Sequence, residues 1–229
     1  MRKVRIGWIG VAAVLALFAG ACSSSGSSVA AGEGGMGLLA FVPRDAAGVV
    51  LVNVDAFSKL AVFDEVVKPD GEKGNEALAM LNKMGIDPKK DIHAMAMGLF
   101  GNVEEKPQVL AVIGTSLQVA ALEKALEGSG HVALAHEQVS GKDCLKLTDK
   151  NDQDTLFLFQ VSDQVLAVSN DSALLGRAMG LVGNEAQSFL KDGRSSELKG
   201  KDALVTLVMA VPPKMKEMGS QGGGMFQMD

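Results

Sequence analysis

The sequence predicts a single α+β domain in which helices pack on an antiparallel or mixed sheet. Three observations lead to this fold class. Short runs rich in Val, Ile and Leu recur along the chain, bounded by turn-forming residues, as strands do. Segments with apolar residues at helical spacing lie between several of these runs. About 170 residues separate a Ser- and Gly-rich start from a Met- and Gly-rich end, which is enough for one domain with a substantial core.

The first half of the domain has the element order strand, helix, strand, strand, helix, strand, with two helices in the first helical position. Apolar periodicity predicts strands over 46–54, 92–100, 108–114 and 131–138, and helices over 56–67, 75–84 and 117–126. Thr115 and Gln118 have the spacing of a capping box and so predict the start of the last helix. This βαββαβ order is ferredoxin-like, the order of the split βαβ arrangement.

The second half extends that order by a meander and further helices. We expect strands over 144–147, 155–161 and 164–169, the last two joined as a hairpin by Ser162-Asp163. Asp171 is expected to cap a helix that continues to residue 181 and packs its leucines inward. A shorter helix over 185–190 and a last strand over 203–211 follow, and Pro212-Pro213 ends that strand.

The first 21 residues have the composition of a secretory signal. A cationic start is followed by an apolar run over 6–18 and by the small residues Ala19-Gly20-Ala21. The apolar run is shorter than the roughly 20 residues that a membrane-spanning helix needs. We therefore divide the chain into a signal peptide (1–21), a Ser/Gly-rich tether (22–37), one α+β domain (38–211) and a Met/Gly-rich flexible tail (212–229).

Cys22, directly after these small residues, resembles the cysteine of the lipobox of bacterial lipoproteins, with Ala19 in the place where that motif usually has Leu. The resemblance implies that the signal is cut before Cys22, which carries acyl chains on its sulfur and its amino group. Ser23 resembles the pattern for sorting to the outer membrane. The implied localisation is an exported protein anchored in a membrane, at the outer membrane facing the periplasm or at the cell surface. The mature part resembles uncharacterised α+β domains of exported lipoproteins.

The charge of the mature chain argues against nucleic acid as a partner. The leader carries three of the 22 basic residues and none of the 27 acidic ones, so 19 basic and 27 acidic residues remain, a net charge of −8. A nucleic-acid binder needs a basic face to meet phosphates. The expected partners are the membrane, through the acyl chains on Cys22, and an unknown envelope protein or small ligand. Cys144 remains as a lone cysteine and is expected to be a small packing residue that shares a strand face with Lys146.

The catalytic motifs in the sequence are incomplete. Ser196 and Lys199 match the S-x-x-K pattern of serine acyl-enzymes, but the companion K-T-G element is absent. Neither a G-x-S-x-G nucleophile elbow nor an H-E-x-x-H zinc motif occurs. We therefore expect a non-enzymatic binding or assembly module that needs no cofactor.

Two alternatives to this function remain. His93, Met95 and Met97 alternate along a predicted strand, so they share a face, and an imidazole with two thioethers is a plausible soft site for copper in a metal-handling lipoprotein. The competing interpretation of the same residues is ordinary core packing, because Met fills gaps in cores. The other alternative is a carrier that holds an apolar ligand between the sheet and the helices.

Overall fold

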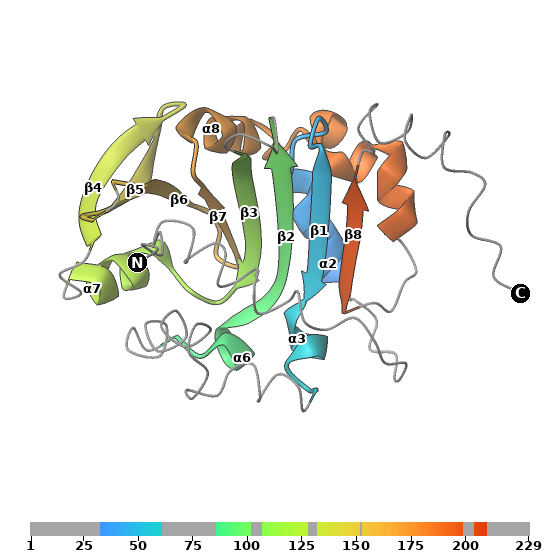
Figure 1. The fold of residues 1–229 in the computed structure, drawn as a ribbon, viewed down its shortest axis with the longest axis horizontal. Helices are drawn as coiled ribbons and strands as arrows, with labels where there is room; N and C mark the ends of the chain where they lie inside the picture. The colour runs from blue at the N-terminus through green and yellow to red at the C-terminus, as the bar shows by residue number, and fades with distance from the viewer. Residues whose placement is uncertain are drawn as a thin grey trace, which may run out of the picture.

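The fold is α+β, built on one antiparallel sheet of eight strands. A computed structural model describes residues 33–60, 86–101, 107–127, 132–151, 153–198 and 204–209. The strands lie side by side in the order β4-β5-β6-β7-β3-β2-β1-β8, and each neighbouring pair is antiparallel (Figure 1). Their bounds are β1 Gly48–Asn53, β2 Ile92–Phe100, β3 Gln108–Thr115, β4 Val132–Val139, β5 Lys142–Asp149, β6 Thr155–Ser162, β7 Val165–Ser169 and β8 Val205–Met209.

The helical elements in the described ranges are short. They are α2 Glu33–Gly37, η2 Leu38–Phe41, α3 Val54–Phe57, α6 Pro88–Asp91, α7 Val119–Glu127, α8 Ser172–Gly180, η3 Glu185–Gln187, η4 Phe189–Lys191 and η5 Gly193–Leu198. None of the helices in these ranges is long and apolar enough to cross a membrane.

Each predicted strand has a counterpart in the sheet. Leu158 of β6 and Leu166 of β7 are buried, and the two strands form the expected hairpin. The structure adds a hairpin between β4 and β5. Ser140 and Gly141 form its turn with φ values of 51° and 74°, the left-handed pair that a type I′ turn requires.

The helix caps were predicted correctly at α8 and wrongly at α7. Asp171 caps α8, because its Oδ1 accepts a hydrogen bond of 2.7 Å from the Leu174 N–H. Thr115, expected to cap a helix with Gln118, is instead the last residue of β3. The first N–H of α7, that of Val119, is bonded at 2.9 Å by Oε1 of Gln160 on β6. This partner lies 41 residues away, so no local motif could reveal it.

The ferredoxin-like strand order is not confirmed. A split βαβ arrangement places another strand between the two that its helix connects. Here β1 and β2 pair directly and antiparallel, with Val50 opposite Met97. After α7 the chain crosses to the far edge as β4, and the meander β4-β5-β6-β7 then returns to β3. The final strand, β8, pairs with β1 at the opposite edge.

The sheet separates two apolar layers. One layer, which we call the α8 face, contains Phe100 and Val112 of the central strands packed with η2, η4 and α8; its fully buried members include Leu39, Leu175 and Phe189. The other layer, which we call the α7 face, contains Leu145, Leu158 and Leu166 together with Leu122 of α7. In Figure 1, α2 and α7 are seen on opposite sides of the sheet.

The last residues of the predicted tether form a helix. Residues 33–37, assigned to the tether, form α2, and a Cβ added at Gly35 would lie 3.6 Å from the Cβ of Ala94 on β2. The folded domain therefore begins by Glu33. The signal peptide, Cys22 and the rest of the tether lie outside the described residues, as do the predicted helix over 75–84, most of the helix over 56–67 and the tail over 212–229.

Candidate functional site

The α7 face carries rows of aliphatic side chains that cross several strands in register. Leu134 of β4 lies opposite Leu147 of β5, which lies opposite Leu156 of β6. A second row joins Leu145 and Leu158, and continues to Val168 on β7. We call these two rows the leucine ladder, formed by Leu134, Leu145, Leu147, Leu156, Leu158 and Val168. Cross-strand neighbours of this kind pack directly on one another.

The leucine ladder is only partly covered. Leu145 and Leu158 are buried under α7, where Leu122 and Leu126 are buried as well. Leu134, Leu147 and Leu156 retain intermediate exposure, although all three are large and apolar. Buried aliphatic residues are ordinary, whereas a contiguous set of partly exposed ones can mark a surface that meets an apolar partner.

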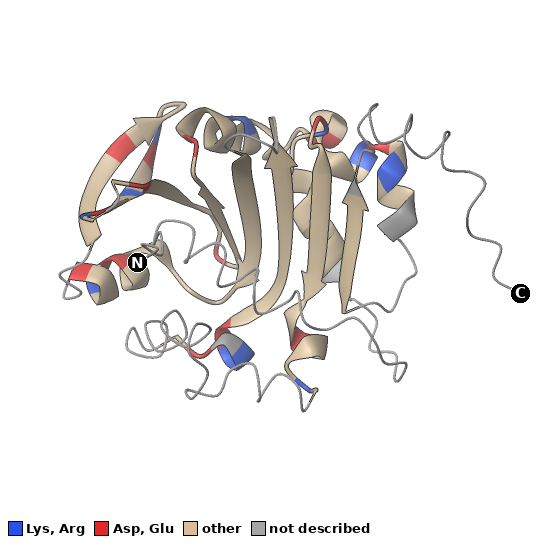
Figure 2. Ribbon diagram, viewed as in Figure 1, with Lys and Arg blue, Asp and Glu red and all other residues tan. Residues whose placement is uncertain are grey.

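Formal charge is concentrated at one end of the sheet, on β4 and β5. Among the eight strands, Lys, Arg, Asp and Glu occur only on these two (Figure 2). Lys146 and Glu137 pair across the two strands at 2.8 Å. The leucine ladder therefore lies next to the charged end of an otherwise uncharged sheet.

A histidine joins α7 to this charged end. The two ring nitrogens of His136 on β4 face two carboxylates: Nδ1 lies 2.6 Å from Oδ2 of Asp143 on β5, and Nε2 lies 2.9 Å from Oε1 of Glu123 on α7. Hydrogen bonds to Glu123 and Asp143, with the charge of Asp143, raise the pKa of His136 above its ordinary value of 6.5. No sequence motif indicates this cluster, because its three members come from three elements and no local spacing relates them.

Of the predicted soft-metal residues, the two methionines are buried and the histidine is exposed. Met95 and Met97 are 3% and 2% exposed, and Met95 packs with Val52 and Val54. His93 lies in a register shift of β2, and its Nδ1 is 3.2 Å from Oδ1 of Asp55 on α3. Within the described residues, no group of three or more His, Cys, Asp and Glu side chains could hold a metal ion. The packing interpretation thus accounts for both thioethers, and copper binding stays a prediction.

The surroundings of Cys144 and Ser196 indicate structural roles for these two residues. Cys144 is 1% exposed in the α8 face, and burial, as the main cause, raises the pKa of its thiol above 9.0, which favours the unreactive protonated form. As predicted, it shares its strand face with Lys146 rather than with the leucines. Ser196 lies in η5 and donates from its hydroxyl to the carbonyl of Gly193 at 2.7 Å; its S-x-x-K partner Lys199 is outside the described residues.

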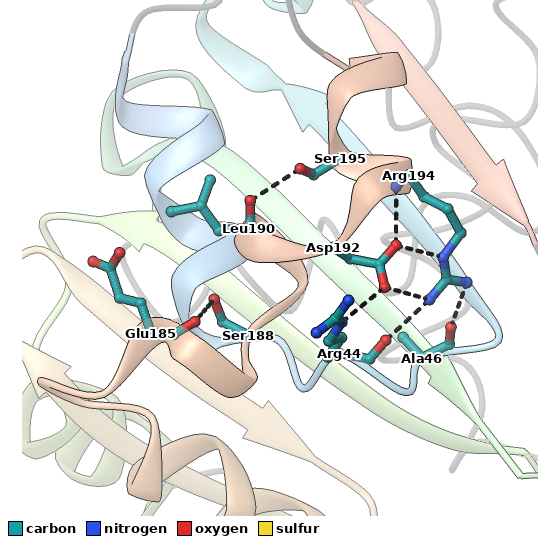
Figure 3. Close-up of polar contacts among 8 residues, drawn as sticks. All are labelled: Arg44, Ala46, Glu185, Ser188, Leu190, Asp192, Arg194 and Ser195. Atoms are coloured by element: carbon teal, nitrogen blue, oxygen red, sulfur yellow. Dashed lines mark hydrogen bonds and ion pairs between the residues drawn. The ribbon is translucent and has the colours of Figure 1, made fainter.

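A polar cluster on the α8 face fastens the end of the domain to its beginning. Nε of Arg194 donates to Asp192 at 2.8 Å, and its two terminal nitrogens donate to the carbonyls of Ala46 and Arg44 at 3.0 and 2.9 Å (Figure 3). The Arg194 guanidinium lies 4.8 Å from the centre of the Phe189 ring. Hydrogen bonds from Arg194 and then from Arg44 lower the pKa of Asp192 from 3.8 to about 2. The hydrogen bonds of this polar cluster are made within the fold, so we assign the cluster to stability rather than to binding.

Comparison with known proteins identifies a similar fold and no family. No family model matches the chain, and no curated protein matches it. One similar solved structure is that of TP0453 in crystal form III, with a TM-score of 0.50 and 11% sequence identity; the match covers 83% of this chain and 68% of that chain. At this identity the likeness concerns the fold alone. The comparisons thus support the α+β architecture and assign the chain to no enzyme family.

Proposed function

We propose that this protein is a lipid-anchored, non-enzymatic binding or assembly module of the cell envelope, and that it binds through the leucine ladder beneath α7. The anchor would be the acyl chains on Cys22. The observation that carries the proposal is the in-register row of Leu134, Leu147 and Leu156, which remains partly exposed. Burying apolar surface is the main driving force of most protein association.

The partner favoured by this surface is an apolar segment of another envelope protein. A photoreactive amino acid placed at Leu134 should form a discrete protein adduct in intact cells. Leu207 is the matched control position, because it lies on β8 opposite Val50 and is 55% exposed at the other end of the sheet. Equal adducts from positions 134 and 207, or none from 134, would contradict this proposal.

A second candidate function is the carriage of an apolar small molecule. It is favoured by the cover that α7 provides, since a ligand held between a helix and a sheet loses more contact with water than one on an open face. A fluorescent fatty acid should then bind the purified protein, and Leu147→Gln should weaken that binding several-fold, while Leu207→Gln should leave it unchanged. Saturable fatty-acid binding without any cellular protein adduct would select this candidate over the first.

A further inference from the structure

The pairing of His136 with Glu123 and Asp143 depends on a proton. Ionised carboxylates only accept hydrogen bonds, and a neutral imidazole donates from one nitrogen while the other presents a lone pair. Both ring nitrogens of His136 face carboxylate oxygens, at 2.6 and 2.9 Å. Only the imidazolium form, which donates from both nitrogens, satisfies the two contacts at once. A neutral ring keeps one of them and turns a lone pair toward the other carboxylate.

The two carboxylates belong to different elements. Asp143 lies on β5, the hairpin partner of β4, and Nε2 of Gln138 also donates to it, at 3.2 Å. Glu123 lies on α7, which packs over the leucine ladder. The contact between His136 and Glu123 therefore joins two parts of the fold, whereas the contact with Asp143 stays within one hairpin.

We propose that His136 is a proton-dependent latch that holds α7 down over the leucine ladder. With the proton in place, α7 is fastened to the β4–β5 hairpin through Glu123. When the proton leaves, Asp143 retains the ring from within its own hairpin, and the link to α7 is the one that is lost. The latch is a property of the fold, while its use in controlling access to the leucine ladder rests on the proposed function.

The other contacts of α7 explain why one end of the helix would respond. Its beginning is held by side chains that do not titrate near neutral pH: Gln160 bonds the Val119 N–H, and Nε2 of Gln118 donates to the Asp163 carbonyl at 3.0 Å. Its later part is held by Leu122, Leu126 and the latch. Loss of the latch therefore loosens the helix from Glu123 onward and leaves its first turn in place.

Within the described ranges, the remaining charged groups on the elements near His136 have other partners or are exposed. Glu137 on the same strand pairs with Lys146 of β5, and the Nζ of Lys142 lies 5.2 Å from the centre of the Phe159 ring. On α8, which also packs on β4, Arg177 contacts Asp45. Lys124 and Glu127 of α7 are exposed. Among the residues that the structure describes, Glu123 and Asp143 are thus the two carboxylates that contact the ring.

The direction of the pH dependence follows from these contacts. Because the folded protein binds the His136 proton more tightly than the unfolded chain does, the latch is fully formed below the ordinary histidine pKa of about 6.5. It opens as the pH rises through the higher pKa of the folded state. Acidity closes the latch and mild alkalinity opens it.

Nuclear magnetic resonance tests the latch directly. The sample is the full chain after the leader with Cys22→Ser, so that no acyl chain competes for the leucine ladder, titrated from pH ~5.5 to ~9, a range that spans the ordinary histidine pKa. We expect the His136 ring to titrate above 6.5, and the amide signals of residues 123–127 to shift with the same midpoint. Fluorescence of an anilinonaphthalene sulfonate dye should rise through that midpoint as the leucine ladder becomes accessible.

Three variants decide the outcome. His136→Gln and Glu123→Gln should each abolish the shift of the α7 amides, while Glu127→Gln, on the same helix one turn later, should preserve it. Unchanged signals of β1, β2 and β3 report that each variant is folded. The latch is overturned if the α7 amides do not follow the His136 midpoint, or if they still do so in Glu123→Gln. If the α7 amide signals follow the His136 midpoint but the dye fluorescence does not, the leucine ladder is rejected as a binding surface and the latch is retained.

Discussion

Neutralising Asp192 should destabilise the domain at neutral pH and have no effect in strong acid. The carboxylate is 14% exposed and is bonded by both Arg194 and Arg44. Its pKa is lowered from 3.8 to about 2, and each pKa unit is worth about 1.36 kcal/mol, which gives an upper value of about 2 kcal/mol. Because the cluster is next to water, which screens it, we expect Asp192→Asn to cost about 1–2 kcal/mol at pH 7.

The sign of the pH dependence distinguishes this mechanism from a packing defect. A carboxylate whose pKa is lower in the folded state contributes stability above its unfolded pKa of 3.8, and loses it as the pH falls to about 2. Urea unfolding of wild type and Asp192→Asn should therefore give free energies that differ at pH 7 and converge in acid. The reasoning is refuted if the two proteins are equally stable at pH 7, or if the difference persists near pH 2.

A second variant distinguishes the contributions of the two arginines to the stability of the domain. Arg44 has a side chain that is 54% exposed and makes one contact with Asp192, at 3.2 Å. Arg194 bonds the same carboxylate and also two backbone carbonyls. Arg44→Gln should therefore cost less than about 0.5 kcal/mol, in the range of exposed ion pairs.

Three other predictions concern packing and the anchor. Gly98→Ala should destabilise the domain by about 1–3 kcal/mol, because a Cβ there would lie 2.7 Å from the ring of Phe100 and 3.0 Å from Cγ1 of Val42, both of which are buried. Gly180→Ala, with no atom within 4 Å of the added Cβ, should not; thermal unfolding compares the two. Met95→Leu should change the free energy of unfolding by less than about 1.5 kcal/mol if the thioether is a packing group. In a Cu(I) competition titration this variant should behave like the wild type. Tight Cu(I) binding by the wild type that is lost in Met95→Leu would instead support the copper site. Cys22→Ser should release the protein from the membrane fraction of cells, and normal fractionation of that variant would reject the lipid anchor.

Local sequence patterns correctly predicted the features that depend on neighbouring residues. Two apolar runs joined by a short link predicted β6, β7 and their hairpin, and an Asp beside an apolar helix predicted the cap of α8. Both signals operate within a few residues of the feature that they predict. Strand alternation predicted that Cys144 and Lys146 share a face of β5.

The features that were missed or misassigned depend on distant residues. The Gly-rich composition of residues 33–37 is typical of a tether, yet these residues pack as a helix against β1 and β2, where small residues allow a close approach. The strand order depends on the long return of the meander, which local hydrophobicity does not encode. Arg194 reaches carbonyls 148 and 150 residues away, and the latch joins three elements.

The partly exposed leucine ladder is the basis of the proposed binding function, and one measurement addresses it most directly. A photoreactive residue at position 134 reports what contacts the ladder in intact cells. Leu147→Gln changes the cross-strand neighbour of position 134 and leaves the photoreactive residue itself in place. We predict that Leu147→Gln lowers the yield of the adduct from position 134 several-fold, while Leu207→Gln leaves that yield unchanged. An adduct yield that is insensitive to Leu147→Gln would contradict the assignment of the leucine ladder as the binding surface.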